Sequence, residues 1–187
     1  MKFSDFGFPG TYVIHPPSFS DERGRFVKTF HAKSFGEAGL RTDWREEFYS
    51  SSGLGVVRGM HFQVPPAHHA KLVSCLVGKV IDVAVDLRRG SPTEGQWRSI
   101  ELNAESALSL YFPSGIAHGF QSLSEASLML YKVTSEHAPE LDGGIAWDSF
   151  GFDWPIQRGQ LSERDLGHPA LSAFKSPFVY EPSESTK

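Results

Sequence analysis

Between residues 56 and 134 the chain is a succession of short apolar runs interrupted by glycine and proline, and this pattern restricts the possible folds most strongly. In the segment 81–87 the odd-numbered residues are uniformly apolar, whereas Asp82 and Asp86 are charged. An alternation of period two is typical of a half-buried β-strand, and the turn-forming residues 89–92 close it. Other short strands are predicted over residues 12–14, 56–63, 72–77, 97–102, 108–112, 118–123 and 128–134.

Helical patterns are few. Residues 31–38 are the best helix candidate, with Gly39 as a plausible C-terminal stop. Residues 161–166 are compatible with a turn or a single helical turn. Short strands at this spacing, without a long amphipathic helix, predict an all-β protein built as a sandwich, barrel or jelly roll.

The composition is that of an ordinary globular protein. The chain has 187 residues, of which 40% are hydrophobic and 21% charged, so we expect one domain over 1–187 with a real core. Residues 172–187 are predicted to be a tail, frayed over the polar segment 181–187. A net charge of −4 gives no reason to expect nucleic acid as a partner, although local arginines and lysines can still bind a phosphorylated ligand.

The single cysteine, Cys75, lies in an apolar run and is predicted to be a small buried core residue. A disulfide framework is impossible, which suits a reducing cytoplasm. Residues 1–10 lack the basic region and apolar run of a signal peptide, and no apolar stretch approaches transmembrane length. We therefore expect a soluble cytoplasmic protein without a membrane partner.

Two polar side chains, Arg58 and His61, interrupt the otherwise apolar strand 56–63. Their burial costs desolvation energy unless something binds there. Because the two positions differ by an odd number, a regular strand would point them to opposite faces. Glycine inside a strand often marks a bulge that redirects a side chain, so we predict a bulge at Gly59.

The string R-G-M-H-F-Q at 58–63 resembles the R-G-(L/M)-H-(Y/F)-Q signature of the dTDP-4-dehydrorhamnose 3,5-epimerase family, and the resemblance extends over residues 19–171. This family has the cupin jelly-roll fold, here expected with a few short helices and a C-terminal segment. It is dimeric, with N-terminal strands exchanged between subunits, so the resemblance implies a homodimer. It also implies cofactor-free epimerisation at C3 and/or C5 of a nucleotide-linked 4-keto-6-deoxyhexose. Further matching strings are D-E-R-G-R-F at 21–26, A-K-L-V at 70–73, P-S-G-I-A-H-G-F at 113–120 and L-S-E-R-D at 161–165.

The resemblance assigns four catalytic roles. His61 would remove the proton next to the ketone, since the pKa of histidine is close to working pH. Asp165 would orient the imidazole and support its cation. Lys71 would stabilise the enolate oxygen, and Tyr131 would return a proton on the opposite face of the ring.

The predicted substrate-binding residues fit the family less closely. Glu46 stands where the family often has a glutamine, His137 where it has a stacking tyrosine, and Asp142 where it has a glutamate. Lys28 also replaces a typical glutamate. These departures fall on the nucleotide side, so the identity of the nucleotide stays open. The predicted binding residues are Arg23, Phe26, Arg58, Gln63, His118, Glu46, His137 and Asp142.

Three alternatives remain at this stage. The first is a single-position 3- or 5-epimerase acting on another sugar nucleotide, for example a CDP- or GDP-linked one. The second is a non-catalytic cupin that binds sugar nucleotides. The third is a metal-dependent cupin, but His61 is followed by Phe62-Gln63, and the adjacent His68 and His69 would chelate poorly from a strand. We therefore predict no catalytic metal, and the lack of a Rossmann fingerprint implies no nicotinamide cofactor.

Overall fold

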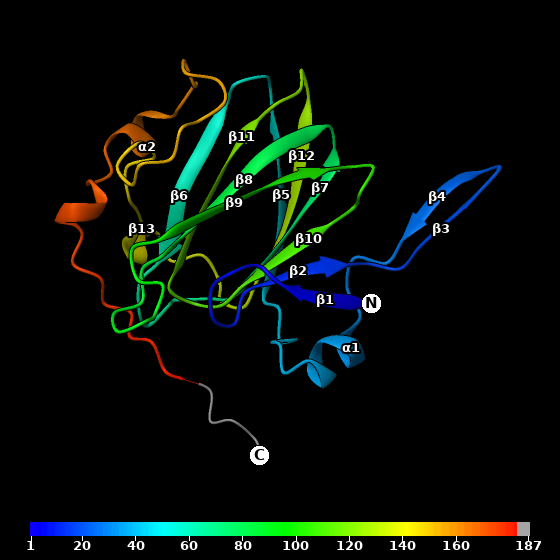
Figure 1. The fold of residues 1–187 in the computed structure, drawn as a ribbon, viewed down its shortest axis with the longest axis horizontal. Helices are drawn as coiled ribbons and strands as arrows, with labels where there is room; N and C mark the ends of the chain where they lie inside the picture. Colours follow the sequence, from blue (N-terminus) through cyan, green and yellow to red (C-terminus); the bar gives the residue numbers. More distant parts are fainter. Residues whose placement is uncertain (183–187) are drawn as a thin grey trace.

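Two antiparallel β-sheets lie face to face in the computed structural model, which describes residues 1–182 (Figure 1). The six-stranded sheet has the order β1 (Lys2–Asp5), β2 (Tyr12–His15), β10 (Ser109–Phe112), β7 (Lys71–Val77), β12 (Ser127–Val133) and β5 (Glu46–Ser52). The five-stranded sheet has the order β13 (Asp142–Gly144), β6 (Val57–Gln63), β11 (Ile116–Ser122), β8 (Lys79–Asp86) and β9 (Trp97–Asn103).

Most neighbouring strands are distant in sequence. Strand β10 lies between β2 and β7, and β11 lies between β6 and β8. This connectivity is that of a jelly-roll sandwich, so the predicted all-β fold is confirmed. Neither of the two short α-helices among the described residues has the length and apolar character needed to cross a membrane.

A hairpin of β3 (Ser18–Asp21) and β4 (Gly24–Val27) projects from the sandwich and forms a separate two-stranded sheet (Figure 1). Its two phenylalanines, Phe19 and Phe26, are 67% and 59% exposed. Large apolar side chains at this exposure are a sign of a surface that another molecule covers.

Both predicted helical segments are confirmed. Helix α1 spans Ala32–Glu37, and Gly39 follows it with φ of 72°, a left-handed conformation that glycine adopts without strain. Helix α2 spans Glu163–Leu166, and the Ser162 side chain accepts a hydrogen bond from the Asp165 backbone N–H as its N-cap. Residues 1–182 also contain the 3₁₀ turns η1 (Pro139–Leu141) and η2 (Leu171–Ala173).

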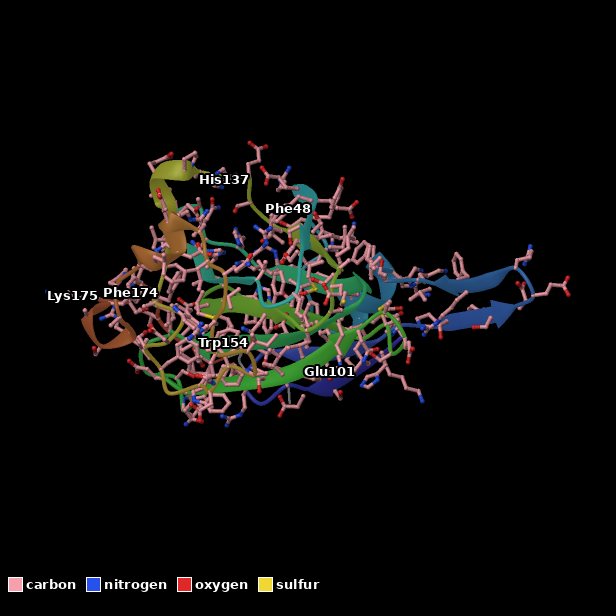
Figure 2. All side chains as sticks on the ribbon, turned by 90° about the horizontal axis from the view of Figure 1, so that it is seen from above. Phe48, Glu101, His137, Trp154, Phe174 and Lys175 are labelled. Carbon is pink, nitrogen blue, oxygen red and sulfur yellow. The ribbon has the colours of Figure 1, made fainter. Side chains whose placement is uncertain are left out.

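The apolar side chains form three layers. Residues such as Val73, Leu110 and Phe120 fill the space between the sheets. The outer face of the six-stranded sheet packs against Phe35 of α1. The outer face of the five-stranded sheet is covered by the C-terminal third of the chain, including Trp154, which Figure 2 shows inside the body of the molecule.

Strand β8 corrects the prediction of a half-buried strand. From Asp82 onward all its residues are buried, on both faces. Val83 and Val85 pack under the C-terminal third, while Asp82 points into the sandwich, where His118 pairs with it. The charged positions mark a polar interior rather than a solvated face.

Part of the predicted tail packs on the sandwich. Within the expected tail 172–187, Phe178 is 5% exposed and packs in the outer layer, and Phe174 contacts Phe62 of β6 with ring centroids 5.0 Å apart. Burial of these aromatic rings holds the segment against the five-stranded sheet. Residues 183–187, most of the segment predicted to fray, lie outside the described residues.

Candidate active site

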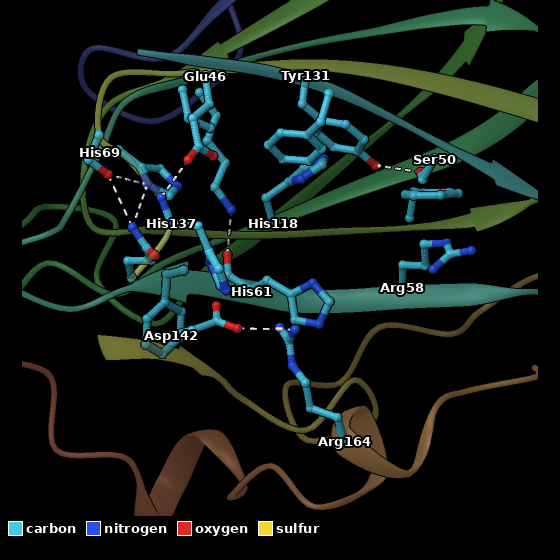
Figure 3. A pocket seen from close by; sticks show the side chains of 17 residues that line it. Glu46, Ser50, Arg58, His61, His69, His118, Tyr131, His137, Asp142 and Arg164 are labelled. Atoms are coloured by element: carbon cyan, nitrogen blue, oxygen red, sulfur yellow. Dashed lines mark hydrogen bonds and ion pairs between the residues drawn. The ribbon is translucent and has the colours of Figure 1, made fainter. Parts of the chain in front are cut away.

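A cavity of about 440 Å³ opens between the two sheets (Figure 3). Figure 2 shows two of its lining residues, Phe48 and His137, on the side of the molecule opposite Glu101 of β9. The lining residues are Glu46, Phe48, Ser50, Arg58, His61, Phe62, Gln63, His69, Lys71, His118, Phe120, Tyr131, Val133, Ser135, His137, Asp142 and Arg164.

A bulge in β6 brings Arg58 and His61 to the same cavity. His61 pairs with His118 of β11, but Arg58 pairs with Phe120, so three steps on β6 oppose two on β11. Gly59 has φ of 144°, and a Cβ there would lie 2.5 Å from the Gly119 Cα. The predicted bulge is confirmed, and only glycine fits it.

His61 and Asp165 form a close pair. The His61 Nε2 lies 2.7 Å from the Asp165 Oδ1, although the residues are 104 positions apart. Burial lowers the pKa of His61, against the opposing influence of Asp165. Burial raises the pKa of Asp165, but the hydrogen bonds from His61 and the Gly59 N–H outweigh it and lower the pKa overall. The result is a neutral imidazole beside a carboxylate, a suitable general base.

Lys71 crosses from the six-stranded sheet towards His61. Its Nζ donates to the His61 backbone carbonyl at 2.9 Å, and the residue is 9% exposed. Burial lowers the pKa of Lys71 to about 8, so the ammonium keeps its proton at neutral pH. A fixed cation inside a cavity can stabilise a developing oxyanion.

Tyr131 lies on the wall that faces His61 (Figure 3). The alternation along β12 turns Met129, Tyr131 and Val133 inward. Burial raises the pKa of Tyr131 above its ordinary value, and the Tyr131 hydroxyl lies 3.4 Å from the Ser50 Oγ. The phenol therefore holds its proton, as a general acid must.

His118 is held by a buried carboxylate. Its Nε2 lies 2.8 Å from the Asp82 Oδ2, and the two side chains are 3% and 0% exposed. The imidazole of His118 also lines the cavity beside Phe120. The predicted position of His118 in the pocket agrees with this, and Asp82 is a partner that the sequence did not reveal.

Glu46 and His137 lie at one end of the cavity (Figure 3), whereas Lys28 does not line it. The Glu46 Oε1 accepts a hydrogen bond from the His137 backbone N–H at 2.8 Å. Gln63 lines the cavity, but its amide already connects two loops, since Nε2 donates to the Ala67 carbonyl and Oε1 accepts from the Ala138 N–H. Gln63 therefore shapes this end of the cavity as well as facing it.

The charged side chains of Arg58 and Asp142 line other parts of the cavity wall, and each contacts a neighbouring polar residue. The Arg58 Nε donates to the Ser52 Oγ at 3.0 Å. Asp142 of β13 pairs with Arg164, whose Nη1 lies 3.0 Å from the Asp142 Oδ2. Arg164 was not among the predicted site residues, although the basic position of the L-S-E-R-D string could have indicated it.

Arg23 and Phe26 lie outside the cavity of their own chain, on the projecting β3–β4 hairpin (Figure 1). Within this chain Arg23 pairs with Asp21, at 2.6 Å between Nη2 and Oδ2. The structure therefore does not bring these two residues to the other six predicted binding residues or to the four predicted catalytic residues.

A group of possible metal ligands was also not predicted. One donor atom from each of His61, Asp165 and His168 lies within 4.8 Å of the others. The sequence-based prediction weighed a His-x-His pair starting at His61 and the adjacent His68 and His69. His168 follows α2 and is brought close to His61 by the fold.

Known proteins are similar to this chain over most of its length. The family model described as dTDP-4-dehydrorhamnose 3,5-epimerase matches residues 5–173. The dTDP-4-dehydrorhamnose 3,5-epimerase of Salmonella typhimurium is 41% identical, over 87% of this chain and 91% of that protein.

Two solved structures are similar throughout. The crystal structure of dTDP-6-deoxy-D-glucose-3,5-epimerase from Legionella pneumophila, in complex with dTDP-4-keto-L-rhamnose, superposes with a TM-score of 0.91 at 35% identity, covering 96% of this chain and 98% of that one. A 3'-monoepimerase from Streptomyces bikiniensis, in complex with dTDP-quinovose, gives a TM-score of 0.84 at 31% identity, covering 89% and 86%.

Proposed function

This chain belongs to the dTDP-4-dehydrorhamnose 3,5-epimerase family, and we propose that His61, Asp165, Lys71 and Tyr131 carry out its reaction. The substrate is a nucleotide-linked 4-keto-6-deoxyhexose of the dTDP-4-dehydro-6-deoxy-D-glucose type, and the product is of the dTDP-4-dehydro-L-rhamnose type. The placement of His61 and Tyr131 on facing walls of one cavity carries this proposal (Figure 3). Inversion at carbon requires a base on one side and an acid on the other.

The ketone at C4 acidifies the hydrogens at C3 and C5. The His61 Nε2 is engaged by Asp165, so Nδ1 is the nitrogen that takes the proton. The carboxylate of Asp165 stabilises the imidazolium that results. The electron pair of the broken C–H bond moves to the C4 oxygen, where the Lys71 ammonium stabilises it.

Reprotonation completes each inversion. The Tyr131 hydroxyl delivers its proton to the opposite face of the enolate, the C4 ketone forms again, and solvent restores the protonation states of Tyr131 and His61. His118, held by Asp82, supplies a further hydrogen bond inside the cavity. These steps need no redox change and no cofactor.

A single-position epimerase is the second candidate. The similarity to a 3'-monoepimerase favours it, because the same base and acid serve one carbon or two. Glu46 and His137 at the nucleotide end differ from the residues expected for the family, so a CDP- or GDP-linked sugar is the corresponding alternative for the nucleotide.

A homodimer is part of the proposal. The hairpin of β3 and β4 holds Arg23 and Phe26 away from its own cavity and leaves Phe19 and Phe26 exposed. A second copy of the chain would cover these rings and bring Arg23 to a substrate. Sedimentation of the wild type and of Phe26→Asp tests this, with a monomeric wild type as the result that would refute it. The buried thiol of Cys75 fits the proposed cytoplasmic location.

The test of the function is hydrogen exchange in D₂O with dTDP-4-keto-6-deoxy-D-glucose, followed by mass spectrometry and NMR. Deuterium at both C3 and C5 is the expected result. Deuterium at one carbon would replace the proposal with the single-position epimerase. Folded protein that incorporates none would exclude this substrate, and CDP- and GDP-linked 4-keto sugars would be tried next.

A further inference from the structure

Behind His61, a second histidine approaches the catalytic carboxylate. The His168 Nε2 lies 3.9 Å from the Asp165 Oδ1, which itself lies 2.7 Å from the His61 Nε2. Neither Asp165 nor His168 lines the cavity. The His168 Nε2 is buried and has no hydrogen-bond partner among residues 1–182, although an unpaired buried nitrogen is costly.

The backbone of β13 leaves room for this histidine. A Cβ on Gly144 would lie 2.5 Å from both Nε2 and Cδ2 of His168. The two imidazole rings meet edge to face, with centroids 5.8 Å apart. The absence of a side chain at Gly144 thus allows His168 to reach the pair of His61 and Asp165.

We propose that His61, Asp165 and His168 bind a late first-row divalent cation, with Zn²⁺ as the best fit, and that the bound metal inhibits the enzyme. Two imidazoles and a carboxylate are a ligand set that Zn²⁺ takes, with water in the fourth position. Tetrahedral ligands about 2.0–2.1 Å from the metal are about 3.3 Å apart. The distances of 2.7 and 3.9 Å each need to change by about 0.6 Å, and the distance between the His61 and His168 nitrogens, which is within 4.8 Å, by at most about 1.5 Å.

The surrounding charges favour reversible binding over a permanent structural metal. The single negative charge of Asp165 neutralises only one of the two positive charges of the cation. The Arg164 guanidinium, whose Nε lies 4.0 Å from the Asp165 Oδ1, adds a positive charge that repels the cation. The Arg164 guanidinium is drawn towards Asp142 by their ion pair at 3.0 Å, which moderates the repulsion. A chelator should therefore remove the metal from folded protein.

Inhibition is expected because a metal bound to one nitrogen of the His61 imidazole changes the protonation of the other. In the free enzyme the His61 Nε2 carries the proton and Nδ1 is basic. A metal on Nε2 takes that lone pair, and the proton moves to Nδ1, so the ring stays neutral but has no lone pair left for a substrate C–H. This half of the inference rests on the proposed function. The substrate cavity stays open, so kcat should fall with little change in KM.

The test combines metal binding with turnover. Protein freed of metal with EDTA is titrated with Co²⁺, whose visible spectrum reports its ligands, and then with competing Zn²⁺. The variants are His168→Asn and, as a matched control, His31→Asn, which changes an exposed histidine before α1. Asp165→Asn, tested for binding alone, removes a second ligand independently.

The wild type and His31→Asn should bind one Zn²⁺ per chain, lose turnover and recover it with EDTA. Changes around a metal site cost 10–100-fold in affinity even outside the ligands, so His168→Asn should need at least about tenfold more Zn²⁺ for binding and for inhibition. Co²⁺ binding that is absent, or unchanged in His168→Asn and Asp165→Asn, would overturn the site. Metal-free wild type without turnover would overturn the proposed function instead, because the spectrum still reports the site.

Discussion

His118 and Asp82 form a fully buried pair, with the His118 Nε2 2.8 Å from the Asp82 Oδ2. Burial raises the pKa of Asp82, and the contact with His118 opposes this shift. Asp82→Ala would leave the imidazole without a partner, at a cost of about 1–3 kcal/mol in the free energy of unfolding. Urea denaturation of wild type and variant measures the difference.

A matched variant separates the hydrogen bond from the packing. Asp82→Asn keeps an oxygen that can accept from His118 and should lose less stability than Asp82→Ala. The alanine variant should also have a lower kcat/KM, because His118 lines the cavity. Equal unfolding free energies for the wild type and both variants would show that the pair contributes nothing.

Removal of the base should nearly abolish turnover. A positioned acid or base typically contributes about 10²–10⁴-fold, so His61→Ala should lower kcat by at least about 10²-fold. Cys75→Ser is the control, since Cys75 is buried in the same sandwich but does not line the cavity. Steady-state rates of the two variants decide the matter, and a His61→Ala enzyme with a near-normal rate would remove His61 from the mechanism.

Tyr131→Phe should separate proton removal from inversion. The base remains, so His61 can still exchange the substrate hydrogen with solvent on one face, whereas delivery to the other face is lost. Epimerised product should therefore fall by about 10²-fold or more, and deuterium incorporation should fall less. NMR of the recovered sugar in D₂O distinguishes the two quantities.

Tyr111→Phe controls for the loss of a buried hydroxyl. Tyr111 is 4% exposed and lies in the layer under α1, away from the cavity. This variant should retain both activities. Equal loss of exchange and inversion in Tyr131→Phe would argue that Tyr131 acts in substrate binding rather than as the acid.

Gly59→Ala should damage both stability and activity. Its Cβ would lie 2.5 Å from the Gly119 Cα, and the φ of 144° is strained for alanine. The bulge would have to shift to relieve this close contact. We therefore expect a destabilisation of at least about 1–3 kcal/mol and a lower kcat. Gly36→Ala, in helix α1 with nothing within 4 Å, should instead stabilise by about 0.5–1 kcal/mol. Thermal unfolding of both variants tests the contrast.

The sequence predicted strands where a short run is rich in apolar residues, as in β12, but not where the strand is mostly polar. Strand β5 was not predicted, because it is an edge strand whose residues from Glu47 to Tyr49 are exposed and whose place comes from backbone pairing with β12. The burial of both faces of β8 was also missed. Its outer face is covered by residues such as Trp154 and Phe178, far away in sequence.

The residues of the site also differ in how far the sequence could predict them. His61 and Lys71 could be predicted because each lies in a matching string, and Tyr131 because the family has a tyrosine at its position; all three line the cavity. Asp82 looked like the polar face of a half-buried strand, and its role required the pairing of β8 with β11. His168 could not be predicted, because it lies in no matching string. It comes close to His61 because the chain after α2 returns to β13.

Acid should destabilise the fold through Asp86. This buried carboxylate accepts hydrogen bonds from Arg88, Ser91 and Thr93. Burial raises the pKa of Asp86, but these donors together outweigh it and lower the pKa below its ordinary value. A lowered pKa means that the unfolded state binds the proton first, so the contribution is complete above about pH 4 to 5 and is lost as pH falls through the folded-state pKa.

Asp86→Asn should therefore be less stable than the wild type at pH 7, and the difference should shrink as the pH is lowered below about 4. Urea denaturation at pH 7, 5 and 3.5 measures it. Asp148→Asn, at an exposed carboxylate, should follow the wild type at each pH. A difference between Asp86→Asn and wild type that stays constant over this range would mean that Asp86 acts through packing and hydrogen-bond geometry, not through its charge.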